Sequence, residues 1–466
     1  MNQHSDALVF FGATGDLAYK KIFPALQAMI KRGNLDVPVI GVAKAGWNLD
    51  QLKDRAKDSL EKHGGLDDAA WAKLSSLLRY VDGDYSDPAT FAEVRKQLGD
   101  ARRPAHYLAI PPSLFEKVVE QLVLSGSAKD ARMIVEKPFG HDLASAQELN
   151  RILLSAFPES SIFRIDHYLA KGPVHNMVSF RFSNSFLEPI WNRNYIESIQ
   201  VTMAEDFGVQ GRGSFYDQTG AIRDVIQNHI FQVLCNLAME SPAASDSESV
   251  RDEKVKVLKA IPPITPDDLI RGQFKGYLDE KGVAPDSEVE TYAVLRMQVK
   301  SWRWDGVPFF IRAGKNLPIT CTEVMARLRK PPHTNTNDPD GPQNYVRFRI
   351  SPEMTIALAA SVTSVSGTGP RQMVEMVATR HPEPTEMEAY ERVLTDAMAG
   401  DATLFARQDY VEEAWRIVDP VLKDKTPVHV YDVHTWGPQD HDPNLIPAGG
   451  WDIPTPEPED VFRVIG

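Results

Sequence analysis

A turn with two glycines lies near the start of the chain, directly after the short apolar run 8–11. It consists of Gly12, Ala13, Thr14, Gly15, Asp16 and Leu17, and a stretch with apolar residues at helical spacing follows it. Glycines at such a junction let the backbone approach a pyrophosphate closely, while the start of the helix supplies N–H groups and partial positive charge. The turn therefore favours a dinucleotide-binding site over a plain turn.

Lys44 directly follows the second apolar run, residues 39–43. An NAD site usually has a carboxylate at this place, where it holds the ribose 2′-hydroxyl. An ammonium group attracts the 2′-phosphate of NADP instead, and the hydroxyl of Thr14 would add a hydrogen bond. Lys44 therefore favours NADP as the cofactor, with NAD as a poorer alternative. The competing interpretation is a solvated surface lysine.

Lys137, in the motif VEKPFG, follows another apolar run. Because the ends of parallel strands face the ligand cleft in this kind of sheet, Lys137 is placed to reach both cofactor and substrate. The peptide bond before Pro138 is a candidate for the cis form, since proline lowers the cost of that isomer. A Lys-Pro pair that only terminates the strand is the commoner alternative.

The segment RIDHYLAK gathers polar side chains near the middle of the chain. Its candidate residues are Asp166, His167, Tyr168 and Lys171. Together they suit an oxyanion or a phosphate group, and a polar loop between domains explains them equally well. The Gly172-Pro173 pair that follows is typical of the start of a helix, with proline at its first turn.

His229 ends the motif DVIQNH, inside a predicted helix over residues 220–239. It lies on the apolar stripe of that helix, and a lone histidine there is most often a buried core residue. A catalytic histidine also needs shielding, together with a partner. Burial lowers the pKa of an imidazole and a nearby carboxylate raises it again. Asp166 is the candidate for that carboxylate.

The first third of the chain is predicted to form alternating strands and helices, and these elements position the glycine turn, Lys44 and Lys137. Short apolar runs separated by stretches of helix length predict a parallel sheet covered on both faces, the doubly wound Rossmann-like α/β architecture. After about residue 164, long alternating stretches predict an α+β domain with one large, mainly antiparallel sheet. We therefore expect a dinucleotide-binding domain over residues 1–165 and a second domain over residues 166–466.

Composition narrows the class of protein further. The 466 residues carry a formal net charge of −13, which argues against a nucleic-acid or membrane-surface partner. The two cysteines, Cys235 and Cys321, lack metal-ligand spacing, so we expect no metal site. No apolar run approaches the length of a membrane span, and no secretory leader precedes the first strand. These features predict a cytoplasmic protein.

The motifs taken together resemble the glucose-6-phosphate dehydrogenase family, in order along nearly the whole chain. The matching segments include FGATGDLAYKKIFPAL, YLAIPPSLF, VEKPFG, RIDHYLAK, DVIQNH and WRWDGVPFFIRAGK. The resemblance implies oxidation of D-glucose 6-phosphate at C1 to 6-phospho-D-glucono-1,5-lactone, with hydride transfer to NADP. This reaction is the first step of the oxidative pentose phosphate pathway. The family also implies a homodimer formed through the large sheet, or a homotetramer.

The resemblance also implies a role for individual residues. His229 is similar to the general base that takes the C1 hydroxyl proton, and Asp166 to the carboxylate that orients it. The implied phosphate ligands are His167, Tyr168 and Lys171, and the implied sugar ligands are Glu205, Asp224, Lys137 and Lys315. Lys137 matches a lysine that bridges sugar and cofactor, and Asp84 and Tyr85 match a segment near the cofactor.

Three positions depart from the family pattern. Thr320 stands where a second basic residue is common, Gly172 where an acidic residue is usual, and Lys44 where arginine is usual. Arginine forks to phosphate and stacks on adenine better than lysine does, so the NADP preference is expected to be weaker. Thr320 and Gly172 keep open the same chemistry on another aldose or aldose phosphate. A catalytically silent nucleotide- or sugar-binding subunit is the remote alternative.

Overall fold

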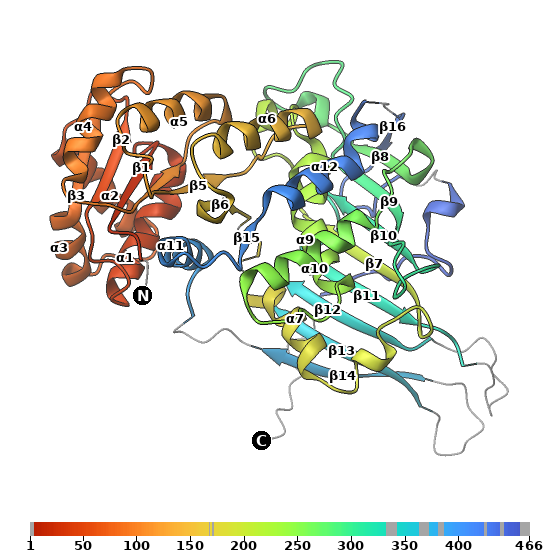
Figure 1. The fold of residues 1–466 in the computed structure, drawn as a ribbon. Coiled ribbons are helices and arrows are strands. Elements are labelled where there is room, and N and C mark those ends of the chain that lie inside the picture. The colour runs from red at the N-terminus through yellow and green to blue at the C-terminus, as the bar shows by residue number, and fades with distance from the viewer. Residues whose placement is uncertain are drawn as a thin grey trace. The chain divides into compact units, whose positions relative to one another are not determined.

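The computed structural model describes residues 4–166, 168–169, 172–331, 343–362, 372–380, 386–423, 426–438 and 442–456. Contacts divide the chain into two compact units, and Figure 1 labels most of their helices and strands. Unit 1 comprises Met1–Lys171, Pro242–Asp252 and Thr385–Glu412, and unit 2 comprises Gly172–Ser241, Glu253–Pro384 and Glu413–Gly466. The sequence places a single division between residues 165 and 166, whereas the contacts assign two later segments to unit 1.

Unit 1 is built on a seven-stranded sheet in the order β15-β6-β5-β4-β1-β2-β3. Its strands are β1 (Ala7–Phe11), β2 (Val39–Ala43), β3 (Leu78–Asp82), β4 (Pro104–Leu108), β5 (Arg132–Glu136), β6 (Ile162–Ile165) and β15 (Phe405–Ala406). All neighbours pair in parallel except β15, which runs antiparallel to β6. The predicted doubly wound parallel sheet is confirmed.

Helices cover both faces of this sheet. One core contains Leu8 and Phe10, and the other contains Val9 and Phe11, because successive side chains of a strand point to opposite faces. The first core is closed by η1 (Ala18–Ile22), α1 (Phe23–Lys31), α2 (Leu49–Lys62), α3 (Asp68–Leu77) and α11 (Ala389–Ala399). The second is closed by α4 (Pro88–Leu98), α5 (Phe115–Leu124) and α6 (Leu143–Leu154). Two short 3₁₀ turns, η2 (Pro112–Leu114) and η3 (Glu159–Ser161), join these elements.

Unit 2 is built on a nine-stranded sheet in the order β14-β13-β12-β11-β7-β10-β9-β8-β16. The strands are β7 (Ile196–Ala204), β8 (Leu269–Phe274), β9 (Tyr292–Gln298), β10 (Pro308–Gly314), β11 (Cys321–Leu328), β12 (Tyr345–Ser351), β13 (Met354–Val362), β14 (Gln372–Arg380) and β16 (Val428–Tyr431). Pairing is antiparallel except between β7 and β10 and between β8 and β16. The predicted large, mainly antiparallel sheet is confirmed.

The helices of unit 2 include the one that carries the candidate base. The predicted helix over 220–239 is observed as the π-helical stretch η5 (Ile222–Ile230) followed directly by α9 (Phe231–Ala238). Gly172 starts a helix as expected, α7 (Gly172–Ser183), which packs against α9. The remaining elements of unit 2 are η4 (Glu188–Ile190), α8 (Gly213–Tyr216), η6 (Pro266–Asp268), η7 (Tyr277–Asp279) and η8 (Pro443–Leu445). Two further helices, α10 (Ser247–Lys259) and α12 (Gln408–Lys423), begin in residues assigned to unit 1 and end in residues assigned to unit 2. None of the described helices is long and apolar enough to cross a membrane.

Candidate active site

The glycine turn connects β1 to the first helix, as the sequence predicts. Gly12 has a φ of +86°, and a Cβ there would lie 2.2 Å from the carbonyl oxygen of Ala109. At Gly15 a Cβ would lie 3.2 Å from the carbonyl oxygen of Gly12. Only glycine fits the first position, so the turn stays tight and its backbone lies close against β4. This geometry fits a dinucleotide whose pyrophosphate binds at the start of the helix.

Hydrogen bonds of the Tyr85 hydroxyl link this turn to the neighbouring strand β2. The N–H of Gly12 donates to the Tyr85 hydroxyl at 2.9 Å and to the carbonyl of Val42 at 2.9 Å. The Tyr85 hydroxyl in turn donates to the carbonyl of Val42 at 3.2 Å. The ring of Tyr85 also lies edge-on to Phe11, with 5.7 Å between ring centroids. Tyr85 therefore lies beside the glycine turn, and its place near a bound cofactor stays a prediction.

Lys44 and Asp84 form an ion pair at the same edge of the sheet. The Lys44 ammonium donates to Asp84 Oδ2 at 2.7 Å, and both side chains are largely open to solvent. The hydrogen bond and charge of Asp84 raise the pKa of Lys44 above its usual range. The same pair, with help from Ser86, holds the pKa of Asp84 well below its usual range. Both groups are therefore fully charged at neutral pH.

Lys137 and Asp166 follow neighbouring parallel strands. Glu136, the last residue of β5, pairs in register with Ile165, the last residue of β6. Lys137 and Asp166 therefore begin the loops that leave the same edge of the sheet, and the Lys137–Pro138 peptide bond is cis. Asp166 is only 3% exposed, and its Oδ1 accepts a hydrogen bond from the backbone N–H of Tyr168 at 3.0 Å. His167 and Lys171 lie outside the described residues.

A buried carboxyl next to these residues was not singled out from the sequence. Glu136 accepts a hydrogen bond from the hydroxyl of Tyr107 on β4, and Tyr390 on α11 is a second hydrogen-bond partner. Burial raises the pKa of Glu136 to about 7, and the charge of Asp166 adds to that rise. The motif VEKPFG contains the only local signal, a glutamate at the end of an otherwise apolar strand.

Unit 2 brings three predicted sugar ligands into one pocket. The lining residues are Met203, Glu205, Tyr216, Ala221, Asp224, Val225, Gly314 and Lys315. Glu205 follows β7 and Lys315 follows β10, and these two strands pair with Ala204 opposite Gly314. The Lys315 ammonium forms a hydrogen-bonded ion pair with the Glu205 carboxylate. Two carboxylates and an ammonium around one small pocket suit the hydroxyl groups of a sugar.

Tyr216 belongs to this pocket and was not predicted as a site residue. Its side chain is 3% exposed, and the Lys315 ammonium lies 5.0 Å from the centroid of its ring. Burial and the nearby charges of Asp224, Glu290 and Glu205 raise the pKa of its hydroxyl. Tyr216 stands in the motif GSFYDQTGA, where its spacing of eight residues before Asp224 gives no periodic signal for a shared pocket.

His229 lies in η5, five residues after Asp224. Its side chain is 5% exposed, and the neighbouring Ile226 and Ile230 are fully buried, as the apolar stripe predicts. π-Helical turns within helices occur frequently at functional sites. The division of the chain puts His229 in unit 2 and Asp166 in unit 1. Their pairing stays a prediction from the sequence.

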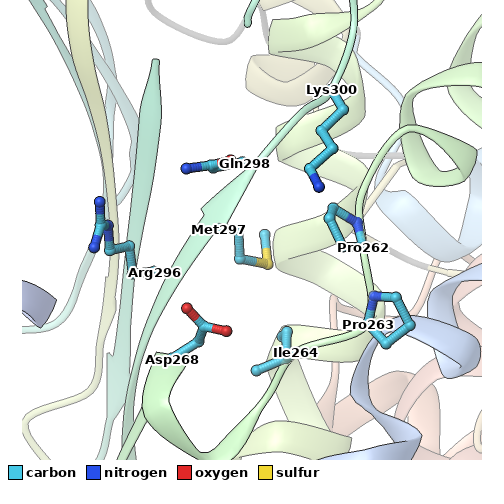
Figure 2. Close-up of a pocket in the computed structure, with 8 residues that line it drawn as sticks. All are labelled: Pro262, Pro263, Ile264, Asp268, Arg296, Met297, Gln298 and Lys300. Carbon is cyan, nitrogen blue, oxygen red and sulfur yellow. The ribbon is translucent and has the colours of Figure 1, made fainter. Parts of the chain in front are cut away.

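Thr320, one of the positions that depart from the family pattern, lies directly before β11. The Thr320 hydroxyl donates to the Asp206 carboxylate and accepts from the Asp206 backbone N–H at 3.0 Å, so this position binds a carboxylate and supplies no cation. Figure 2 shows a different pocket, between the segment 262–264 and β9. It contains none of the predicted site residues. Within the described ranges, no three His, Cys, Asp or Glu side chains gather to hold a metal ion.

Both domains of the chain are similar to those of one known family. Residues 9–176 match the family model described as the glucose-6-phosphate dehydrogenase NAD binding domain. Residues 178–450 match the model of the glucose-6-phosphate dehydrogenase C-terminal domain. The chain belongs to the glucose-6-phosphate dehydrogenase family. It is therefore an oxidoreductase with a nicotinamide-dinucleotide-binding domain, as the resemblance in sequence implies.

Individual family members are similar over almost their whole length. The chain is 42% identical over 452 residues to glucose-6-phosphate 1-dehydrogenase 1 of Mycobacterium bovis, covering 97% of both chains. It is 38% identical to the glucose-6-phosphate 1-dehydrogenase of Aggregatibacter actinomycetemcomitans, over 96% of this chain and 97% of the relative. The crystal structure of the Mycobacterium avium enzyme matches with a TM-score of 0.90 at 41% identity, covering 98% of this chain and all of that one. A glucose-6-phosphate dehydrogenase solved in complex with its substrate glucose-6-phosphate matches with a TM-score of 0.88 at 36% identity, with coverage of 98% and 100%.

Proposed function

We propose that this chain oxidises D-glucose 6-phosphate at C1 to 6-phospho-D-glucono-1,5-lactone and reduces NADP. The observation that carries the proposal is the match of both domains to the glucose-6-phosphate dehydrogenase family, including a relative solved with glucose-6-phosphate. The pocket formed by Glu205, Asp224 and Lys315 supports it, because these side chains suit sugar hydroxyls.

In the proposed reaction, the imidazole of His229 takes the proton of the C1 hydroxyl. The carboxylate of Asp166 orients the ring and stabilises the imidazolium that forms, as in other Asp–His pairs. NADP, held at the glycine turn, would supply the acceptor for the hydride that leaves C1. One sugar C–H and one O–H bond are thus exchanged for a carbonyl bond, with one proton released from His229 to solvent.

The remaining residues bind and orient the two substrates. Glu205 and Asp224 accept hydrogen bonds from sugar hydroxyls, while Lys315 and Lys137 donate to sugar oxygens, Lys137 also contacting the cofactor. The sugar phosphate is bound by His167, Tyr168 and Lys171. The Glu205–Lys315 ion pair supports this assignment because it fixes one donor and one acceptor in the same pocket.

The cofactor-binding residues are those of unit 1. The turn Gly12–Leu17 holds the pyrophosphate, and Lys44 binds the 2′-phosphate of NADP, with Asp84 and Tyr85 beside it. The φ of +86° at Gly12 and the Tyr85 hydrogen bond to the Gly12 N–H support a preformed dinucleotide turn. NADP is therefore the proposed acceptor and NAD the poorer one.

A crossed assay tests the proposed substrate. Glucose 6-phosphate and glucose are each offered with NADP and with NAD, and formation of the reduced cofactor is followed by absorbance. The account predicts that kcat/KM for glucose 6-phosphate exceeds that for glucose by several orders of magnitude, because unpaired phosphate ligands reject a substrate that lacks the phosphate. Equal values would favour the alternative that Thr320 suggests, an unphosphorylated aldose.

We also propose a cytoplasmic homodimer formed through the large sheet of unit 2. The dimer is supported by Val374 and Met376, which point to the same side of β14 with exposures of 48% and 59%. The cytoplasmic location is supported by the two cysteines, which are buried and form no disulfide. Light scattering after size exclusion distinguishes a dimer from a tetramer. A monomer at micromolar concentration would rule out this assembly.

A further inference from the structure

We infer that the Lys44–Asp84 ion pair sets the choice between NADP and NAD, with Asp84 opposing the 2′-phosphate of NADP and accepting the ribose 2′-hydroxyl of NAD. The inference rests on the proposed function, because it assumes a dinucleotide at the glycine turn. It assigns to Asp84 a role opposite to that of Lys44.

The register of the sheet places both residues at the same edge as the glycine turn that is proposed to hold the pyrophosphate. Strands β1, β2 and β3 are neighbours, and Ala43 at the end of β2 pairs with Asp82 at the end of β3. Lys44 and Asp84 therefore leave the same edge, next to the turn after β1. Tyr85, the residue after Asp84, accepts the hydrogen bond of the Gly12 N–H at 2.9 Å. Asp84 is therefore followed directly by a residue that is hydrogen-bonded to the turn proposed to bind the pyrophosphate.

The carboxylate of Asp84 is held in one orientation. Its Oδ1 accepts hydrogen bonds from the backbone N–H of Ser86 at 2.8 Å and from the Ser86 hydroxyl at 2.6 Å. Its Oδ2 faces the Lys44 ammonium at 2.7 Å. A ribose hydroxyl that approaches Lys44 therefore meets a preoriented carboxylate oxygen as well as an ammonium group.

Asp82, the other carboxylate at this edge, already accepts hydrogen bonds from the backbone. Its Oδ1 accepts from the N–H groups of Ala45 and Gly46, each at 2.9 Å, and from the Tyr80 hydroxyl at 2.9 Å. These bonds shape the loop after β2 and leave that oxygen saturated with donors. Asp84 is therefore the carboxylate suited to a cofactor hydroxyl.

The charges of the pair suit either cofactor. Lys44 and Asp84 together carry no net charge, so a 2′-phosphate gains the attraction of the ammonium and meets the repulsion of the carboxylate. A ribose 2′-hydroxyl meets no such repulsion and donates to the carboxylate, the usual arrangement in NAD sites. Lys44 alone would strongly favour NADP, and Asp84 reduces that preference.

The test is direct titration of the protein with NADPH and with NADH, followed by cofactor fluorescence in the absence of sugar. The variant is Asp84→Asn, which keeps the shape and the oxygen that binds Ser86 but removes the charge. We expect NADPH to bind about fivefold tighter, because one repulsive charge near an exposed phosphate is removed. We expect NADH to bind about fivefold weaker, because its hydroxyl loses a charged acceptor. The NADPH gain is expected to shrink in high salt.

Two further variants give the test its controls. Asp36→Asn makes the same charge change on an exposed residue before the start of β2, and both affinities are expected to stay within twofold of wild type. Lys44→Ala is expected to weaken NADPH about tenfold and NADH by less than twofold. A second cation, Arg55, stacks on Tyr19 with 4.6 Å to the ring centroid. If Arg55 held the phosphate instead, Lys44→Ala would leave NADPH binding unchanged.

The inference is overturned if Asp84→Asn leaves the ratio of NADPH to NADH affinity within twofold of wild type, or weakens both cofactors equally. The readout needs no turnover, so it is separate from the identity of the sugar. A wild-type protein that binds NADPH but does not oxidise glucose 6-phosphate would refute the proposed function and leave this inference standing. A wild-type protein that binds neither cofactor would refute both.

Discussion

Replacing Glu136 by glutamine should make the protein's stability less sensitive to pH. Glu136 lies at the end of β5, hydrogen-bonded to Tyr107 and Tyr390 and flanked by the charges of Lys137 and Asp166. Burial raises the pKa of its carboxyl from 4.5 to about 7 in the folded protein. The folded state therefore holds this proton more firmly than the unfolded chain does, and it loses stability as the pH rises from about 4.5 through about 7.

The size of the effect follows from the same two values. A difference of about 2.5 pKa units corresponds to about 3 kcal/mol once the pH is well above 7, and to about 1 kcal/mol near pH 5.5. The glutamine side chain has no proton to lose in this range. The free energy of unfolding of Glu136→Gln minus that of wild type should therefore grow by about 2 kcal/mol between about pH 5.5 and pH 8.5.

Urea unfolding of both proteins at these two pH values measures the difference. The matched control is Glu120→Gln, which removes an exposed carboxylate on α5. A difference that is constant with pH, or that falls as pH rises, would show that Glu136 is ionised throughout and would refute the reasoning. If the free energy of unfolding of Glu120→Gln minus that of wild type changed with pH to the same extent, the effect would come from the loss of one net charge and not from Glu136.

Two other substitutions test how the fold supports the site. Gly12→Ala should destabilise unit 1 by about 2–3 kcal/mol and weaken NADPH binding at least tenfold, because its Cβ would collide with the Ala109 carbonyl at 2.2 Å. Gly33→Ala, also at positive φ but with open space around its Cβ, should cost about 1 kcal/mol and leave NADPH binding unchanged; equal losses would contradict this account. Arg181→Met should lower the free energy of unfolding by about 3 kcal/mol in denaturant titrations, because two buried carbonyls at the end of α9 lose their donor. A loss below about 1 kcal/mol would mean that water replaces the guanidinium.

Local patterns in the sequence were sufficient for much of the fold. Apolar runs such as 39–43 predicted buried parallel strands, because strands covered on both faces need apolar side chains throughout. The long alternating stretches predicted the large sheet of unit 2. The assignment of α11 and β15 to unit 1 could not be predicted in this way, since it depends on contacts between residues more than two hundred positions apart.

The residues of the candidate site differ in the same way: some could be predicted from the local sequence, and others depend on contacts between distant elements. The glycine turn and Lys44 were predictable because strand order alone brings them to one edge. Glu205 and Lys315 came from family resemblance, and only the pairing of β7 with β10 explains why they form an ion pair. Tyr216, Glu136 and the Lys44–Asp84 contact have no periodic signal, because each depends on side chains from separate elements meeting in three dimensions.

The most direct test of the central claim is the turnover of His229→Asn with glucose 6-phosphate and NADP. Loss of a general base should lower kcat by roughly 10²–10⁴-fold. The KM for the sugar, NADPH binding and the circular dichroism spectrum should stay close to wild type, because asparagine is smaller and polar and the phosphate and cofactor ligands are unchanged. A variant with an intact fold and a kcat within a few-fold of wild type would contradict the account.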